Sequence, residues 1–269
     1  MVDIPIDDRE PTQVAFRGGG FDPVARKWVS WLCFAGAIVL WQAASEAGLV
    51  DPLFLPSPLA IARSLGDLAM SGELARHFGA SLMRIGAGWI IGAAAGVVVG
   101  SLIGLFGLWR SAGLPFISAL FPIPKIALLP LLILWLGIGE ASKVATIALG
   151  VFFPMAISAY AGVDNVPRNL IRMAQSFDVP FLRIVANVVL PGMLPSVLAG
   201  CRISASIALI LVVAAEMIGA NVGIGALVLT AGNLMQTDKL MAGIAAISML
   251  GLLVGAAISW LERALLSWR

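Results

Sequence analysis

Charged residues are scarce in this 269-residue sequence: Asp, Glu, Lys and Arg together make up 12% of it, about half of their share in soluble globular domains. Hydrophobic residues make up 60%, and a water-soluble fold of this size cannot bury so much apolar surface. Soluble classes of protein are therefore excluded, and we predict an integral membrane protein. The net charge of +2 is too small to indicate a nucleic-acid partner.

Residues that usually carry chemistry are scarce as well. The one histidine, His77, lies outside the apolar runs, where we expect a solvated surface residue. Cys33 and Cys201 lie within apolar runs and lack the spacing of metal ligands, so we interpret both as small core residues and expect no metal site. Residues 137–143 fail as a phosphate-binding loop because Ser142 stands where glycine is required. We predict no enzyme and no cofactor in this chain; a partner would supply ATP and Mg for uphill work.

Apolar runs of about 20 residues match the thickness of a bilayer. Such runs cover 28–47, 82–106, 112–136, 144–163, 197–218 and 240–261. They predict an all-α polytopic membrane protein of about six transmembrane helices over residues 27–269. Residues 1–26 are predicted to form a flexible cytoplasmic arm. The segment Pro58–Met70 predicts an amphipathic helix at the membrane surface.

The distribution of basic residues predicts the sidedness of these spans. If both termini are cytoplasmic, that side holds the larger set: Arg9, Arg17, Arg26, Lys27, Arg110, Arg168, Arg172, Arg183, Arg263 and Arg269. The other side then holds Arg63, Arg76, Arg84, Lys143 and Lys239. Because cytoplasmic loops carry an excess of Lys and Arg, this arrangement is favoured.

The second apolar run repeats glycine at every fourth position. The five glycines are Gly88, Gly92, Gly96, Gly100 and Gly104. This spacing gives a helix one face without side chains, which a neighbouring helix can approach closely. We interpret the face as a packing surface, and the alternative that it lines a conduit stays open.

The third run is interrupted by Pro115, Pro122, Pro124 and Pro130. Prolines free backbone carbonyl groups, which a membrane protein tolerates only where they are buried in protein or face water. We therefore place this broken span in the interior of the molecule.

The charges within the apolar runs are few, and each is expected to face protein or water. Two roles stay open for Lys125, Pro130, Arg202 and Glu216: they brace the helices, or they line a translocation path. In the second role, Lys125 would contribute positive potential to a path for an anion.

A polar segment, the 164–195 loop, separates the fourth and fifth runs. Asn165 is predicted to cap a short helix, with Pro167 in its first turn, that ends at about Phe177. Asp178 is predicted to cap a second helix that ends near Leu190 and Pro191. Two short amphipathic helices joined by a tight break would form a compact docking surface for a soluble partner.

The 164–195 loop resembles the cytoplasmic coupling loop of ABC importer permeases. That pattern reads Glu-Ala-Ala, three residues, Gly, nine residues, Ile, any residue, Leu-Pro. The positions that correspond here are Arg172, Met173, Ala174, Asp178, Val188, Leu190 and Pro191. The spacing is the same, but Arg172 stands in place of glutamate and Asp178 in place of glycine.

Other segments are similar to the nitrate, sulfonate and taurine branch of these permeases. They are Leu55–Pro58, Phe121–Glu140, and Val213–Ile218 followed by Gly223–Gly225. The resemblance covers about residues 50–262. It implies the type I ABC importer permease fold in a bacterial inner (plasma) membrane.

The resemblance also implies the partners and the cargo. Two ATPase subunits would dock on the 164–195 loops of two permease copies, which are identical or paired paralogues. A periplasmic or lipid-anchored binding protein would deliver a small anion, and nitrate, taurine, alkanesulfonates, bicarbonate and aromatic acids all remain open. Two other classes of membrane protein are less well supported. An ion-coupled transporter needs carboxylates in mid-membrane, and Glu216 is the one available. A membrane-embedded enzyme needs a catalytic cluster, and the sequence has no acidic or histidine cluster.

Overall fold

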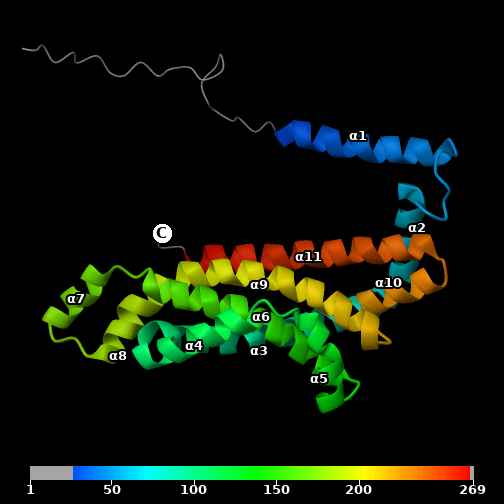
Figure 1. Cartoon of the computed structure of the whole chain (residues 1–269). Helices are drawn as coiled ribbons and strands as arrows, with labels where there is room; N and C mark the ends of the chain where they lie inside the picture. The colour runs from blue at the N-terminus through cyan, green and yellow to red at the C-terminus, as the bar shows by residue number, and fades with distance from the viewer. Residues whose placement is uncertain (1–26, 267–269) are drawn as a thin grey trace, which may run out of the picture.

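The computed structural model describes residues 27–266, and every regular element in that range is a helix (Figure 1). The predicted arm at residues 1–26 lies outside the described residues. The elements in order are α1 (Lys27–Glu46), α2 (Pro58–Met70), α3 (Glu73–Leu105), α4 (Gly107–Leu120), the 3-10 helix η2 (Lys125–Leu128), α5 (Leu129–Leu136), α6 (Glu140–Asp164), α7 (Arg168–Ser176), α8 (Phe181–Ile184), the π-helical turn η3 (Val185–Val189), α9 (Leu190–Gly219), α10 (Ile224–Asn233) and α11 (Thr237–Leu265).

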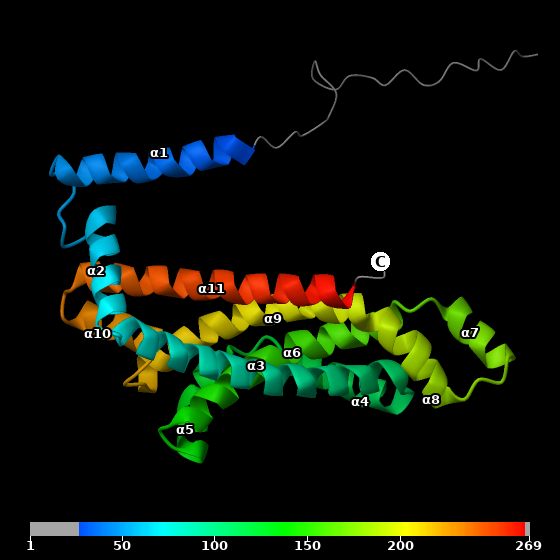
Figure 2. The same ribbon diagram turned by 180° about the vertical axis from the view of Figure 1, so that it is seen from behind.

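Five helical runs in this range are long and apolar enough to cross a membrane, and a bent pair makes up to six. The pair is α4 with η2 and α5, which meet at 89°. Figures 1 and 2 show α7 and α8 at one end of the bundle, the loop end, and α2 and α10 at the other, the α10 end. The end of α11 lies at the loop end in both views. The predicted all-α polytopic membrane fold is confirmed.

The sequence sets both ends of α2 as predicted. Ser57 precedes it in an extended conformation, and its hydroxyl oxygen accepts a hydrogen bond from the Ala60 N–H at 3.1 Å. Pro58 occupies the first turn, where the missing N–H costs nothing. The predicted helix at Pro58–Met70 is therefore confirmed, and its location at the membrane surface stays a prediction.

The glycine face of α3 lies directly against α6. A Cβ atom added to Gly96 would lie 2.6 Å from the Phe152 carbonyl oxygen and 2.7 Å from the Met155 Cβ. Cβ atoms added to the other four glycines would meet residues of α6, namely Ile147, Ala148, Ala156 and Val163. The two backbones thus approach to a distance that any side chain on this face would prevent.

The first boundary predicted in the 164–195 loop is wrong. Asn165 does not cap α7: it has helical dihedral angles, and its N–H donates to the Ala161 carbonyl oxygen at 3.0 Å, so it ends α6. Pro167 is extended and precedes Arg168, the first residue of α7. The span ends at Asp164, one residue beyond the predicted run 144–163, and Asn165 completes its last turn.

Asp178 ends the first loop helix and does not begin the second. Its φ is +54°, its N–H donates to the Gln175 carbonyl at 3.0 Å, and the Val179 N–H donates to the Ala174 carbonyl at 3.1 Å. These two bonds form a Schellman motif, in which the left-handed position usually holds glycine. Asp178 therefore has the left-handed conformation at the position where the coupling-loop pattern has glycine. The predicted tight break is present.

The second loop helix does not end near Leu190 and Pro191, as the sequence predicted. It passes through η3 into α9, giving one helical run from Phe181 to Gly219. A proline ring clashes with the carbonyl group of the preceding turn in a regular α-helix. The wider π-helical turn stands just before Pro191, where such turns accommodate local distortion without ending the helix.

Candidate functional site

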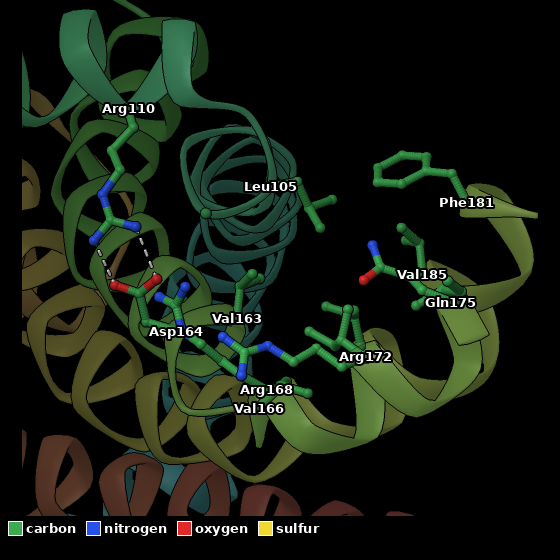
Figure 3. Close-up of a pocket in the computed structure, with 14 residues that line it drawn as sticks. Leu105, Arg110, Val163, Asp164, Val166, Arg168, Arg172, Gln175, Phe181 and Val185 are labelled. Carbon is green, nitrogen blue, oxygen red and sulfur yellow. Dashed lines mark hydrogen bonds and ion pairs between the residues drawn. The ribbon is translucent and has the colours of Figure 1, made fainter.

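A pocket of about 360 Å³ lies beneath α7 at the loop end, where α3, α6 and the helix that begins at Phe181 come together. Its polar lining consists of Arg110, Asp164, Arg168, Arg172 and Gln175 (Figure 3). The rest of the lining is mostly aliphatic. The pocket is therefore apolar toward the bundle and basic toward α7.

An ion pair forms one wall of the pocket and joins the start of α4 to the end of α6. Arg110 donates through Nη1 to Asp164 Oδ1 at 2.9 Å and through Nη2 to Asp164 Oδ2 at 2.7 Å. The same Nη2 donates to the Tyr160 hydroxyl oxygen at 2.9 Å, and the guanidinium lies 5.1 Å from the centre of that ring. Bidentate geometry fixes both side chains, so the two oxygens of Asp164 are engaged by Arg110.

The helix α7 presents two unlike faces. Its pocket face carries Arg168, Ile171, Arg172 and Gln175, at the spacing of one side of a helix. A surface helix ordinarily turns its apolar side to its own core. The opposite face of α7 instead exposes its large apolar side chains, with Leu170 41%, Met173 55% and Phe177 76% exposed. An exposed apolar stripe of this kind is suited to contact with a second protein.

The six residues that the sequence singled out in the loop occupy two separate places. Arg172, Ala174 and Asp178 lie in and just after α7, where Arg172 turns to the pocket and Ala174 is half-buried. The other three lie further along the chain, in η3 and at the start of α9: Val188, Leu190 and Pro191. The two stretches meet at the pocket, which Arg172 lines together with Val185 and Val189.

A second polar cluster lies at the α10 end and is centred on Arg84, which is 4% exposed. Its Nε and Nη2 donate to the two oxygens of Glu140, Nη2 at 2.6 Å. Its Nη1 donates to Glu216 Oε1 at 2.7 Å and to the Val222 carbonyl oxygen at 2.6 Å. One guanidinium thus ties α3 to the starts of α6 and α10 and to the end of α9.

Glu216 is fully buried and every bond to it comes from the protein. Besides Arg84, the Ser81 hydroxyl donates to it at 2.8 Å and the Gly225 N–H at 2.9 Å. A Cβ at Gly223 would lie 2.5 Å from its Oε1, so this position requires glycine. A buried charge satisfied in this way braces the helices that supply its partners.

Three residues at this end are not where the sequence placed them. His77 is half-buried, and its Nδ1 lies 3.1 Å from the Gly223 nitrogen and 2.7 Å from the Gly223 oxygen, so it is not a solvated residue. Arg84 and Lys143 are buried within α3 and α6 and do not belong to exposed outer loops. The sequence signal missed was that Arg84 falls inside the apolar run 82–106, where an arginine requires a carboxylate partner.

Lys125 and Pro130 lie at the break between α4 and α5. Lys125 Nζ donates to the carbonyl oxygens of Leu120, Phe121 and Ile123 at 2.7, 3.2 and 2.7 Å. An ammonium group has three donors, and here each meets a carbonyl freed by the break after α4. Pro130 lies exposed in the first turn of α5. The prediction that the broken span lies in the interior is wrong for this chain, because α4, η2 and α5 bury only Ile117, Leu129 and Leu132.

Arg202 joins α9 to α11 on the outside of the bundle. Its Nη2 donates to Glu262 Oε2 at 2.6 Å, with 63% of the arginine side chain exposed. Within residues 27–266, no three His, Cys, Asp or Glu side chains are grouped so as to hold a metal ion.

Known proteins resemble the chain over most of its length. The family model of the binding-protein-dependent transport system inner membrane component matches residues 92–267. A Bacillus subtilis protein that carries the name aliphatic sulfonates transport permease protein SsuC is 35% identical over 243 residues, covering 90% of this chain and 88% of that one. The taurine transport system permease protein TauC of Escherichia coli is 37% identical over 236 residues, covering 86% of each.

Solved structures share the fold. Two crystal forms of the MetNI methionine ABC transporter, in inward-facing conformations, match with TM-scores of 0.62 and 0.64 at 22% and 20% sequence identity. Each match covers 73% of this chain and 98% of the other. The architecture predicted from the sequence and the family resemblance are both confirmed. The chain belongs to the family of binding-protein-dependent transport system inner membrane components, the membrane-spanning permease subunits of ABC importers.

Proposed function

We propose that this chain forms the translocation path for a small sulfonate, such as taurine or an alkanesulfonate, and that ATP is hydrolysed by a separate subunit docked on the 164–195 loop. The observation that carries the docking role is the exposed apolar face of α7, with Leu170, Met173 and Phe177 turned away from the bundle. The names of the two relatives at 35% and 37% identity support the sulfonate class.

The proposed setting is a bacterial inner (plasma) membrane with the loop end in the cytoplasm. Arg168, Arg172 and Arg183 all lie on the loop, and Arg263 lies in the last turn of α11 at the same end. This basic end supports a cytoplasmic location for the loop and for both termini. The α10 end would then receive cargo from an external binding protein.

A second copy of the chain, identical or paralogous, completes the proposed path. Residues 27–266 of one copy form a bundle whose buried centre is packed with side chains from α3, α6 and α9. A path between two copies would let cargo cross the membrane without any disruption of that core. ATP and Mg would be bound by the ATPase partner.

The docking role is tested by a matched pair of methionine variants. Met173→Asp puts a charge on the outward face of α7, whereas Met70→Asp makes the same change at the end of α2, where the side chain is 90% exposed. Both chains should insert into membranes. Met173→Asp should lose co-purification of the ATPase encoded beside it, and Met70→Asp should retain it. Retention of the ATPase by Met173→Asp would show that α7 is not the docking surface.

The cargo is tested with the assembled complex in proteoliposomes. ATP hydrolysis is measured with the cognate binding protein, either empty or loaded with taurine, an alkanesulfonate or nitrate. Stimulation by a sulfonate-loaded binding protein and not by a nitrate-loaded one is expected. Stimulation by nitrate alone would contradict the sulfonate assignment and leave the docking result untouched.

A further inference from the structure

The pocket beneath α7 carries positive charge that residues 27–266 neutralise only in part. Three guanidinium groups line it, and the one carboxylate, that of Asp164, already has both oxygens bonded to Arg110. None of the ion pairs formed among residues 27–266 uses Arg168 or Arg172. The two arginines stand one turn apart on α7, a spacing at which like charges destabilise a helix by about 0.2–0.5 kcal/mol.

Arg168 and Arg172 lie on the pocket side of α7 and keep contact with solvent, as does Gln175. Figure 3 shows Arg168 and Arg172 reaching across the pocket toward Asp164, with Gln175 beside its mouth. The apolar residues of α7 take the solvent side instead. This orientation gathers guanidinium donors that form no ion pair with residues 27–266 around one open pocket, an arrangement that suits an anion with several oxygen atoms.

The place of the pocket in the membrane agrees with its chemistry. The spans α3 and α6 end beside it, at Leu105 and Asp164, so it lies at the level where lipid headgroups meet the protein. Aliphatic side chains such as Val163 and Val185 line its bundle side. Basic pockets between helices at this level bind phospholipid headgroups.

We infer that this pocket is an oxyanion-binding site in which Arg168 and Arg172 hold a phosphate or sulfonate group and Gln175 adds an amide donor. The group belongs to an anionic phospholipid or to a free anion, and the two sources share the chemistry of a tetrahedral oxyanion. The bound anion joins the inner face of α7 to the bundle through the wall formed by Arg110 and Asp164. It thereby holds the loop helix in position, whatever protein docks on the outer face.

The test is hydrogen exchange of the α7 amides, residues 168–176, in the full-length chain assembled in lipid nanodiscs. Three conditions are compared: phosphatidylcholine alone, phosphatidylcholine with phosphatidylglycerol, and phosphatidylcholine with millimolar inorganic phosphate or methanesulfonate. Binding at ten times the dissociation constant should slow exchange by about 10-fold if opening of α7 releases the anion.

Substitutions of the loop arginines identify the residues responsible. The double variant Arg168→Gln with Arg172→Gln should lose the slowing, whereas Arg183→Gln, an exposed arginine of the same loop outside the pocket lining, should keep it. Unchanged exchange in α6 shows that the double variant is folded. Should it fail to fold, the variant Arg168→Lys with Arg172→Lys takes its place and should bind more weakly than the wild type.

Each outcome decides the inference. Slowing by phosphatidylglycerol alone assigns the site to a lipid headgroup, and slowing by the free anion assigns it to a soluble oxyanion. If neither condition slows exchange in α7, or if the double variant responds as the wild type does, the inference is overturned.

Discussion

Replacing Gly96 with alanine should force α3 away from α6. The new Cβ would lie 2.6 Å from the Phe152 carbonyl oxygen, whereas ordinary contact begins at 3.4 Å, so the backbones must separate by up to about 0.8 Å. A gap of roughly 0.5–1 Å removes about a quarter to a half of the dispersion energy of each contact across it. Overpacking of this kind costs about 1–3 kcal/mol.

Gly86 of the same helix supplies the matched control. A Cβ added there meets nothing within 4 Å, so Gly86→Ala changes helix propensity and nothing else. Because both variants gain the same propensity of about 1 kcal/mol, the difference between them isolates the cost of overpacking. That difference of about 1–3 kcal/mol corresponds to about a 5- to 150-fold change in the unfolding equilibrium constant.

The assay measures the free energy of unfolding of the two alanine variants in detergent. Each variant is titrated with a denaturing surfactant, and its unfolding is followed by circular dichroism. Gly96→Ala should be the less stable of the two. Equal stabilities, or a more stable Gly96→Ala, would refute the close contact between α3 and α6.

Two further substitutions test the bracing residues. Glu216→Gln leaves Arg84 paired with Glu140 alone and removes the charge that its buried hydrogen-bond donors face, so it should lower the free energy of unfolding by about 1–3 kcal/mol. Glu262→Gln breaks an ion pair with 35% of the glutamate exposed and should cost less than about 1 kcal/mol. Similar losses would show that Glu216 does not hold the α10 end together. Lys125→Met removes the side-chain donor from the Phe121 and Ile123 carbonyl oxygens and should cost about 1–3 kcal/mol in the same assay. An unchanged stability for that variant would show that water satisfies those carbonyls and that Lys125 is free for another role.

The periodic features of the sequence predicted the fold well. A bilayer imposes one length and one polarity on every span, so the apolar runs and the glycine repeat at Gly88–Gly104 carried direct structural information. The break in the third span followed in the same way from Pro122 and Pro124, because neither can donate a backbone hydrogen bond.

Local signals misled where neighbouring structure overrode them. Asn165 has a strong preference for capping helices, yet the apolar end of α6 extends into it. Pro191 ends helices in many sequences, but here the π-helical turn lets the helix continue. The partnership of Arg84 with Glu140 and Glu216 could not be predicted, because it joins residues 56 and 132 positions apart that only the packed bundle brings together.

The uninterrupted helix from Phe181 to Gly219 has a mechanical consequence. Its 39 residues would span about 58 Å if straight, at about 1.5 Å per residue. A tilt of about 5° at one end of such a rod displaces the other by about 5 Å. Glu216 lies within a turn of the far end. A tilt of α8 that is not absorbed at η3 therefore produces a larger displacement at the Arg84 cluster. The flexibility of that one π-helical turn determines how much of the tilt is transmitted.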